Sequence, residues 1–179
     1  MKLIFLACLL FAGPAKEQQA SNPHTEVSFF ANAPIGKIHA VNEEAFSSIN
    51  LNTGEIIVRA QNKGFQFPQK FMERKFNQDI MESLKYPYSE FKGKITEKEE
   101  LKQEGQHRVY VDGILTLHGI SKAYHTYAWI NVQGDTIHTS ANFKVKSTDH
   151  HIKIPTLLAV KFAEQLDIHI SGVYLLHKS

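Results

Sequence analysis

The sequence predicts a mainly β protein in which antiparallel strands close into a barrel or stack as a sandwich. Short segments with apolar residues at every second position follow one another along most of the chain. Turns that contain glycine separate them, such as Asn52–Gly54 and Gly134–Asp135. Only two segments show helical periodicity, so helices are expected to be minor elements.

The clearest strands lie in the second half of the chain. Over residues 107–117 apolar side chains occupy one face and polar side chains the other, and residues 124–132 alternate in the same way. The turn Gly134–Asp135, with glycine first, favours a type II′ hairpin that places residues 137–145 opposite them. Further strands are expected at 25–31, 35–42, 46–51, 54–62, 88–95 and 167–175. The total is eight or nine antiparallel strands at short spacing.

The two helical segments interrupt this pattern. Residues 68–83 are predicted to form the first helix, with one apolar stripe made by Phe71, Met72, Phe76 and Ile80. Residues 155–166 are predicted to form the second, because proline stands at its start and large apolar residues recur at every fourth position.

The N-terminus has the pattern of a secretory signal peptide. Lys2 precedes an apolar run over residues 3–12, and Gly13-Pro14-Ala15 offers small residues for cleavage. A membrane span needs about 20 apolar residues, so this run is too short to be one. We therefore predict a signal peptide at 1–15, a flexible mature N-terminus at 16–23, and one barrel domain over 24–179. The expected location is the periplasm or the extracellular space.

Cys8 is the single cysteine of the chain. Too little of the apolar run precedes it for lipid attachment, so we interpret it as an ordinary signal-peptide residue. Its removal would leave a mature protein without disulfides, a thiolate nucleophile or a cysteine-based zinc site.

Composition and motifs give little support for catalysis or for nucleic-acid binding. The formal charge is +2 and no basic block stands out, which argues against nucleic acid. The ten histidines could ligate a metal or act as bases, which keeps a metal-dependent or histidine-based enzyme as an alternative. However, no His-Glu-x-x-His or Gly-x-Ser-x-Gly motif is present. His125 and His138 fall on the polar strand faces, so we interpret the histidines as solvated and predict no catalytic residues, metal or cofactor.

Several motifs resemble one known family. Residues 71–93, FMERKFNQDIMESLKYPYSEFKG, hold Met-Glu, Phe-Asn and Met-Glu-Ser-x-Lys-Tyr-Pro at the spacing of the signature segment of the YceI-like family. Residues 113–122, GILTLHGISK, are close to another of its motifs, and the similarity extends over about 25–175. The chain departs from the family at Lys75, where many relatives carry histidine, and at His150, which replaces a tyrosine.

The resemblance implies an eight-stranded antiparallel, lipocalin-like β-barrel with two short α-helices. It also implies a non-catalytic binding protein for an apolar chain lipid such as a polyisoprenoid or a fatty chain. Such a protein would contact membranes only transiently for ligand exchange, and a homodimer is left open. A barrel of this size is either plugged by side chains or encloses one slender ligand. Each buried CH₂ of a chain ligand contributes about 0.8 kcal/mol.

The residues expected to line such a site are apolar and lie on the predicted inner faces: Phe65, Phe67, Phe71, Met72, Phe76, Leu115, Leu117, Ala128, Ile130, Ala141 and Phe143. The Gly134–Asp135 turn is expected to set Ala128 opposite Ala141, which would leave open volume. The same apolar residues would also fill the core of a barrel without ligand, so a filled-barrel interaction module is a further alternative.

Overall fold

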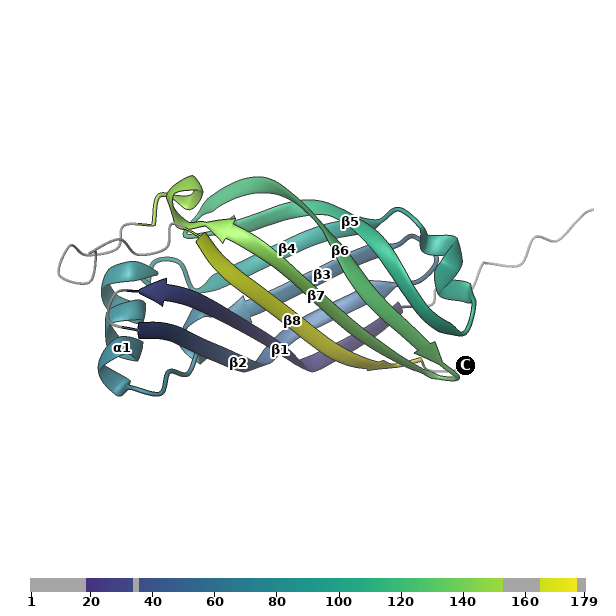
Figure 1. The fold of residues 1–179 in the computed structure, drawn as a ribbon, viewed down its shortest axis with the longest axis horizontal. Coiled ribbons are helices and arrows are strands. Elements are labelled where there is room, and N and C mark those ends of the chain that lie inside the picture. The colour runs from purple at the N-terminus through teal and green to yellow at the C-terminus, as the bar shows by residue number, and fades with distance from the viewer. Residues whose placement is uncertain (1–18, 34–35, 153–164, 177–179) are drawn as a thin grey trace, which may run out of the picture.

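Eight antiparallel strands form a closed barrel in sequence order (Figure 1). The computed structural model describes residues 19–33, 36–152 and 165–176. The strands are β1 (Gln19–Ala33), β2 (Gly36–Asn50), β3 (Glu55–Gln61), β4 (Tyr88–Ile95), β5 (Gly105–Leu117), β6 (Ile120–Gln133), β7 (Thr136–Lys146) and β8 (Gln165–Leu175). Pairing of β8 with β1 closes the barrel. The prediction of a mainly β, eight-stranded barrel is therefore confirmed.

The predicted register of the central hairpin is also confirmed. Val132 pairs with Ile137, and Ala128 pairs directly with Ala141. Gly134 has φ +58° while Asp135 keeps a negative φ, as a type II′ turn requires. Because side chains alternate along a strand, this register sends both alanines to the interior.

The first two strands are longer than predicted. Residues 19–23, expected to belong to a flexible N-terminus, are part of β1, and Gln19 pairs with Asn50. Ala20 is only 2% exposed, so this segment is packed against the barrel. Pro23 lies at a register shift, where the missing N–H costs no ladder hydrogen bond. The strands predicted at 35–42 and 46–51 are one continuous strand, β2.

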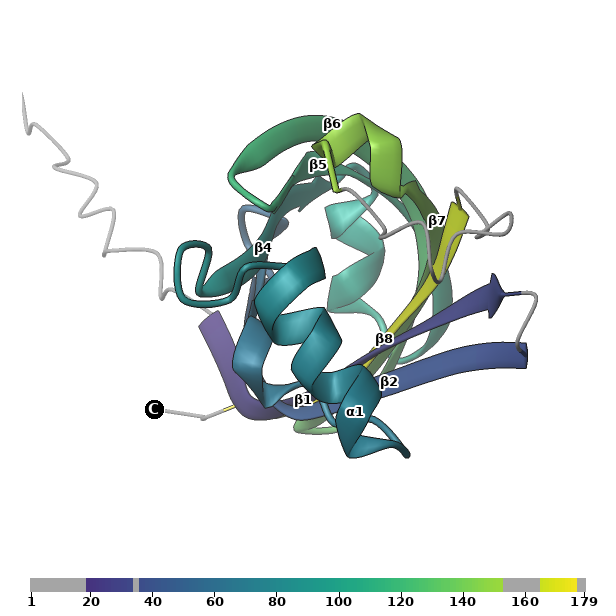
Figure 2. The ribbon, with the colours of Figure 1, turned by 90° about the vertical axis from the view of Figure 1, so that its left-hand side faces the viewer.

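The connection between β3 and β4 crosses one end of the barrel (Figure 2). It begins with the 3₁₀ turn η1 (Asn62–Gly64) and continues as the helix α1 (Lys70–Lys75) and the π-helical turn η2 (Phe76–Ile80). We call α1 and η2 together the cap. The predicted helix at 68–83 is thus shorter and changes its winding at Phe76, whose carbonyl accepts the Met81 N–H five residues on, at 2.8 Å. π-Helical turns are rare and often occur at functional sites.

Two further turns flank the barrel: η3 (Lys98–Lys102) at the end opposite the cap, and η4 (Ser147–His150) after β7. Most of the second predicted helix, and the predicted signal peptide, lie outside the described residues. Leu166, expected at the end of that helix, belongs to β8. In the described part of the chain no helix has the length and apolar character needed to cross a membrane.

Candidate functional site

The barrel contains an apolar cavity of about 130 Å³ directly beneath the cap, which we call the outer cavity. Side chains from the cap, from the segment that leads to it and from several strands line it, among them Phe29, Phe65, Phe67, Met72, Phe76, Met81, Leu115, Leu117 and Phe143. An apolar cavity of about 150 Å³ stays dry and accepts a benzene-sized molecule. The outer cavity therefore offers room for an apolar group of that size without rearrangement.

Phe76 is the centre of an aromatic cluster that joins the cap to the barrel wall. Its ring centroid lies 5.1 Å from that of Phe67, 5.6 Å from that of Phe29 and 5.7 Å from that of Phe65. Aromatic pairs at such distances contribute about 0.5–1.5 kcal/mol each beyond their buried area. Phe76 itself is buried. The cluster is thus both a lining of the outer cavity and the main apolar contact of the cap.

Most of the residues selected from the sequence lie around this cavity. Seven of them line it: Phe65, Phe67, Met72, Phe76, Leu115, Leu117 and Phe143. The prediction for Phe71 is wrong, because its side chain is 53% exposed. Met72 and Phe76 lie one helical turn apart and take the inward face, and Phe71, one position before Met72, points outward. Its ring instead lies 5.9 Å from the Lys75 ammonium.

A second cavity of about 60 Å³, the inner cavity, lies farther from the cap. The remaining selected residues, Ala128, Ile130 and Ala141, line it together with Phe143. It shares four lining residues with the outer cavity: Val58, Phe91, Phe143 and Ile170. The rings of Phe91 and Phe143, with centroids 6.3 Å apart, therefore stand where the two cavities meet.

Two paired glycines determine where the Phe91 ring lies. Gly93 pairs with Gly113 across β4 and β5. A Cβ atom on Gly93 would approach the Phe91 ring to 2.6 Å, and one on Gly113 would approach it to 2.5 Å, both far inside van der Waals contact. Any side chain at either position would therefore displace the ring that separates the two cavities.

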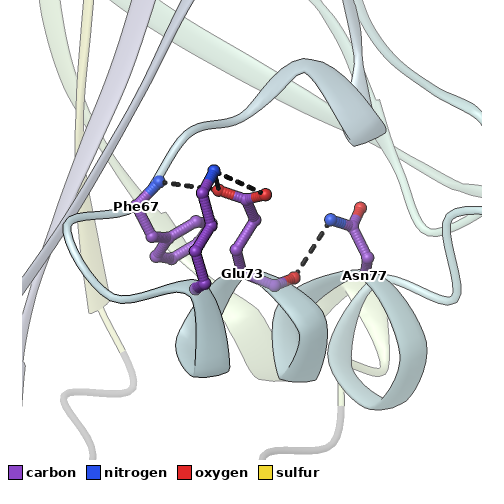
Figure 3. A network of polar contacts seen from close by, with 4 residues as sticks. Phe67, Glu73 and Asn77 are labelled. Carbon is purple, nitrogen blue, oxygen red and sulfur yellow. Dashed lines mark hydrogen bonds and ion pairs between the residues drawn. The ribbon is translucent and has the colours of Figure 1, made fainter.

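Polar contacts attach the cap to the segment that leads into it (Figure 3). The Glu73 carboxylate accepts a hydrogen bond from the Phe67 backbone N–H at 3.4 Å and pairs with Lys70 at 2.9 Å. The Lys70 contact, followed by the Phe67 hydrogen bond, lowers the pKa of Glu73. Asn77 donates to the Glu73 carbonyl at 3.0 Å and accepts from the Ser83 hydroxyl at 2.7 Å. Asn77 thus ties the helix end to the backbone and does not line either cavity.

The far end of the cap is fixed to the β5–β6 hairpin. His118 Nε2 lies 2.8 Å from the Glu82 carboxylate, and the Tyr86 ring lies against the His118 ring with centroids 4.3 Å apart. Glu82 and His118 have φ values of +45° and +49°, a left-handed conformation that costs energy for residues with a Cβ. This pair of contacts holds two strained residues against each other.

His150 is completely buried, which corrects the expectation that the histidines are solvated. Its Nδ1 lies 2.9 Å from the Ile120 carbonyl, which can only accept, so Nδ1 carries the proton. Its Nε2 then accepts from the Tyr124 hydroxyl at 3.2 Å. Burial lowers the pKa of His150 below its usual value. The ring is a neutral structural bridge between η4 and the β5–β6 hairpin.

The other predictions about histidine are partly tested. His125 and His138 are exposed on the outer face, as predicted. Among the described residues, no three or more His, Cys, Asp or Glu side chains form a group able to hold a metal ion. The absence of a bound metal in the protein stays a prediction.

A profile of the family described as the YceI-like domain matches residues 19–174. The chain belongs to the YceI-like family. This is a family of binding domains, and the resemblance found in the sequence is confirmed. No curated protein matches the chain.

Solved structures share the YceI-like fold at low sequence identity. The chain is similar to a polyisoprenoid-binding domain from Saccharophagus degradans implicated in plant cell wall breakdown, with 14% identity, a TM-score of 0.79, and coverage of 90% of this chain and 100% of that one. It is similar to Burkholderia cenocepacia BcnA, with 13% identity, a TM-score of 0.66, and coverage of 83% and 95%. A Campylobacter jejuni YceI protein matches at 16% identity and TM-score 0.54, with coverage of 100% and 94%.

The lining residues that were not predicted from the sequence include Phe29, Phe91 and Tyr174, which shape the interior of the YceI-like barrel. Alternation could have found Phe29, because it shares a strand face with Val27 and Ala31, which are buried. Phe91 lies on the same face of β4 as Ile95, and Tyr174 lies on the same face of β8 as Ile170. No pattern in the sequence indicates that Phe91 separates two cavities, since this depends on the pairing of Gly93 with Gly113.

Proposed function

We propose that this YceI-like protein binds an apolar chain lipid, of polyisoprenoid or fatty type, inside its barrel and performs no catalysis. The observation that carries the proposal is the outer cavity, whose walls are almost wholly apolar and which lies under a cap made of few elements. A slender ligand gains about 0.8 kcal/mol per buried CH₂ in such an environment and needs few polar contacts. The similarity in fold to the polyisoprenoid-binding domain of Saccharophagus degradans supports the same ligand class.

A long chain needs more room than the two cavities offer. Their volumes are about 130 and 60 Å³. Met72 and Met81, which line the outer cavity, are flexible side chains that adapt to irregular volumes. The π-helical turn at Phe76 is short, so the cap can shift without breaking a long helix. We therefore propose that ligand entry moves the cap side chains and that Phe91 turns aside to join the cavities.

The proposed site of action is the periplasm or the extracellular space, with brief membrane contact for ligand exchange. The positively charged, apolar N-terminal pattern supports export. N-terminal sequencing of the protein recovered from the cell envelope or the medium tests this. A mature chain that begins between residues 13 and 19 would support export, whereas full-length protein in the cytoplasm would contradict it.

Solvent extraction of purified protein tests the ligand proposal. We expect the mature protein to release a chain lipid in a stoichiometric amount, detected by mass spectrometry. Ala60→Leu places three more carbons in the outer cavity, since Ala60 lines it, and should lower the lipid content. Ala123→Leu makes the same change at an exposed position of β6 and should not. A lipid-free extract from well-folded wild-type protein would favour a filled-barrel interaction module instead.

A further inference from the structure

The inner cavity ends at a group of hydroxyls contributed by four strands. Tyr174 of β8 and Thr139 of β7 line it. The Tyr174 hydroxyl lies 2.7 Å from the Ser47 hydroxyl of β2, which in turn is hydrogen-bonded to the Thr25 hydroxyl of β1. Thr25, Ser47 and Tyr174 are buried. A chain of hydrogen-bonded hydroxyls therefore borders the inner cavity, whose walls are otherwise mostly apolar.

Thr139 extends this chain of hydroxyls on the β7 side, because its side chain also forms a hydrogen bond with the Tyr174 hydroxyl. Its hydroxyl lies 3.4 Å from the Gly172 carbonyl, longer than the usual 2.7–2.8 Å of such bonds. Burial raises the pKa of Tyr174, so its phenol keeps the proton at neutral pH and remains a donor as well as an acceptor. A ligand oxygen in the inner cavity could join this network by accepting the Thr139 proton, in place of the long bond to the Gly172 carbonyl.

The charges around the two cavities limit what kind of head group can lie there. Among the described residues that line them there is no lysine or arginine, and the one histidine, His125 beside the inner cavity, is exposed. The one carboxylate, Glu90, pairs with Arg59 at 3.6 Å and Lys92 at 2.6 Å. Both cations are exposed, so this network faces solvent. An unpaired phosphate or carboxylate in the inner cavity would lose its hydration without a cation to replace it, which is strongly unfavourable.

We infer that the inner cavity is a subsite for an uncharged, hydrogen-bonding head group, of alcohol, phenol or amide type. The ligand enters head first, its polar atom meets Thr139 and Tyr174, and its chain runs past Phe91 and Phe143 into the outer cavity. This inference rests on the proposed function and adds to it the chemistry of the head group and the direction in which the ligand lies.

Three probes with one C15 chain test the subsite: farnesol, the hydrocarbon farnesene and farnesyl monophosphate. Their affinities are measured by competition against the fluorescent apolar probe 1-aminoanthracene. One net neutral hydrogen bond corresponds to a roughly two- to tenfold advantage of farnesol over farnesene. Farnesyl monophosphate should bind more weakly than farnesol, since its phosphate must stay out of the inner cavity.

Amino-acid substitutions test which hydroxyl gives farnesol its higher affinity over farnesene. Thr139→Val keeps the shape of the side chain and should abolish the farnesol advantage, and Thr139→Ser should restore it. Tyr174→Phe should reduce it too, provided that circular dichroism shows a folded barrel. Thr116→Val is the matched control, because Thr116 lines neither cavity and its hydroxyl is bonded to the Ser121 hydroxyl at 2.8 Å. This control should keep the full advantage.

The results that would contradict the proposed subsite differ from those that would contradict the proposed lipid binding. Equal affinities for farnesol and farnesene, or an advantage that Thr139→Val leaves intact, would overturn the subsite while chain binding stands. Farnesyl monophosphate that binds as tightly as farnesol would also overturn it. Displacement by none of the three probes would overturn the subsite and the proposed chain binding together.

Discussion

Small residues decide how much open space this barrel keeps. Ala128 and Ala141 form a cross-strand pair beside the inner cavity, and the Gly93–Gly113 pair holds the Phe91 ring at its edge. Larger residues at the two alanines would fill the inner cavity, since eight strands leave room for either side chains or one slender ligand. A side chain at either glycine would clash with the Phe91 ring and with the backbone of the paired strand. Whether the barrel can hold a ligand or is filled by its own side chains thus depends on the size of a few residues.

Ala141→Leu tests this dependence. The added carbons should occupy the inner cavity of about 60 Å³, so we expect weaker binding of farnesol, while stability falls by no more than about 1–3 kcal/mol. Chemical denaturation and probe competition measure the two effects. Ala123→Leu on the exposed face of β6 is the control. Unaltered farnesol affinity in Ala141→Leu would show that the inner cavity is not used.

His150 makes stability depend on pH in a predictable direction. Burial lowers its pKa in the folded state, so between pH 7 and pH 5 the unfolded chain takes up a proton more readily than the native protein. The contribution of His150 is therefore complete above its ordinary pKa of about 6.5 and is lost as the pH falls. We expect the free energy of unfolding to drop more steeply over this range in wild type than in His150→Gln. Parallel curves for the two proteins would contradict the prediction.

Among the elements, the cap differs most from what its sequence suggests. Helical periodicity indicated one stripe that includes Phe71, but α1 ends after six residues and η2 winds differently. The inward positions are Met72 and Phe76, while Phe71 is exposed. A periodic pattern assumes constant winding, whereas the π-helical turn is accompanied by the Asn77–Ser83 hydrogen bond and by contacts of Phe76 with the rings of Phe29 and Phe65.

Phe76→Ala, with Phe71→Ala as its control, tests the role of the cap. Truncation of Phe76 removes three ring contacts and costs roughly 3–5 kcal/mol if the site is rigid. If the cap opens locally, part of the loss should appear as faster ligand release with a smaller fall in stability. Phe71→Ala is expected to change stability by less than about 0.5 kcal/mol, because its side chain is exposed. Severe destabilisation with unaltered release would make the cap a structural plug.

An element could be predicted from the sequence when the residues that determine its structure lie close together in the chain. The register of the β6–β7 hairpin was predicted correctly, since Gly134–Asp135 and the alternation around it fix the pairing, although β6 begins earlier than predicted, at Ile120. The start of β1 was missed because residues 19–23 are polar and owe their strand to pairing with the end of β2. The burial of His150 was not predicted either, because it depends on contacts with residues that are distant in the sequence. Only the fold brings the Ile120 carbonyl and the Tyr124 hydroxyl to its ring.

At the scale of the whole barrel, two connections at its opposite ends differ in the sign of their charge. The β3–β4 connection, which contains the cap, has five basic and three acidic residues, whereas the β4–β5 connection at the opposite end has four acidic and two basic. The cap end also presents Leu84, which is 87% exposed and adjacent to Lys85. Apolar side chains next to lysines are typical of surfaces that contact anionic lipid headgroups.

This difference in charge predicts that the protein contacts a membrane with the end of the barrel that carries the cap. We expect it to sediment with vesicles that contain 30% phosphatidylglycerol and not with purely zwitterionic ones, and we expect added salt to weaken the binding. Leu84→Asp should reduce binding about tenfold, because it removes an apolar contact and adds a negative charge. Leu175→Asp is the control, since Leu175 is 61% exposed at the opposite end of the barrel. Equal losses in the two variants would mean that the cap end has no special affinity for lipid, and ligand exchange would then have to proceed through solution.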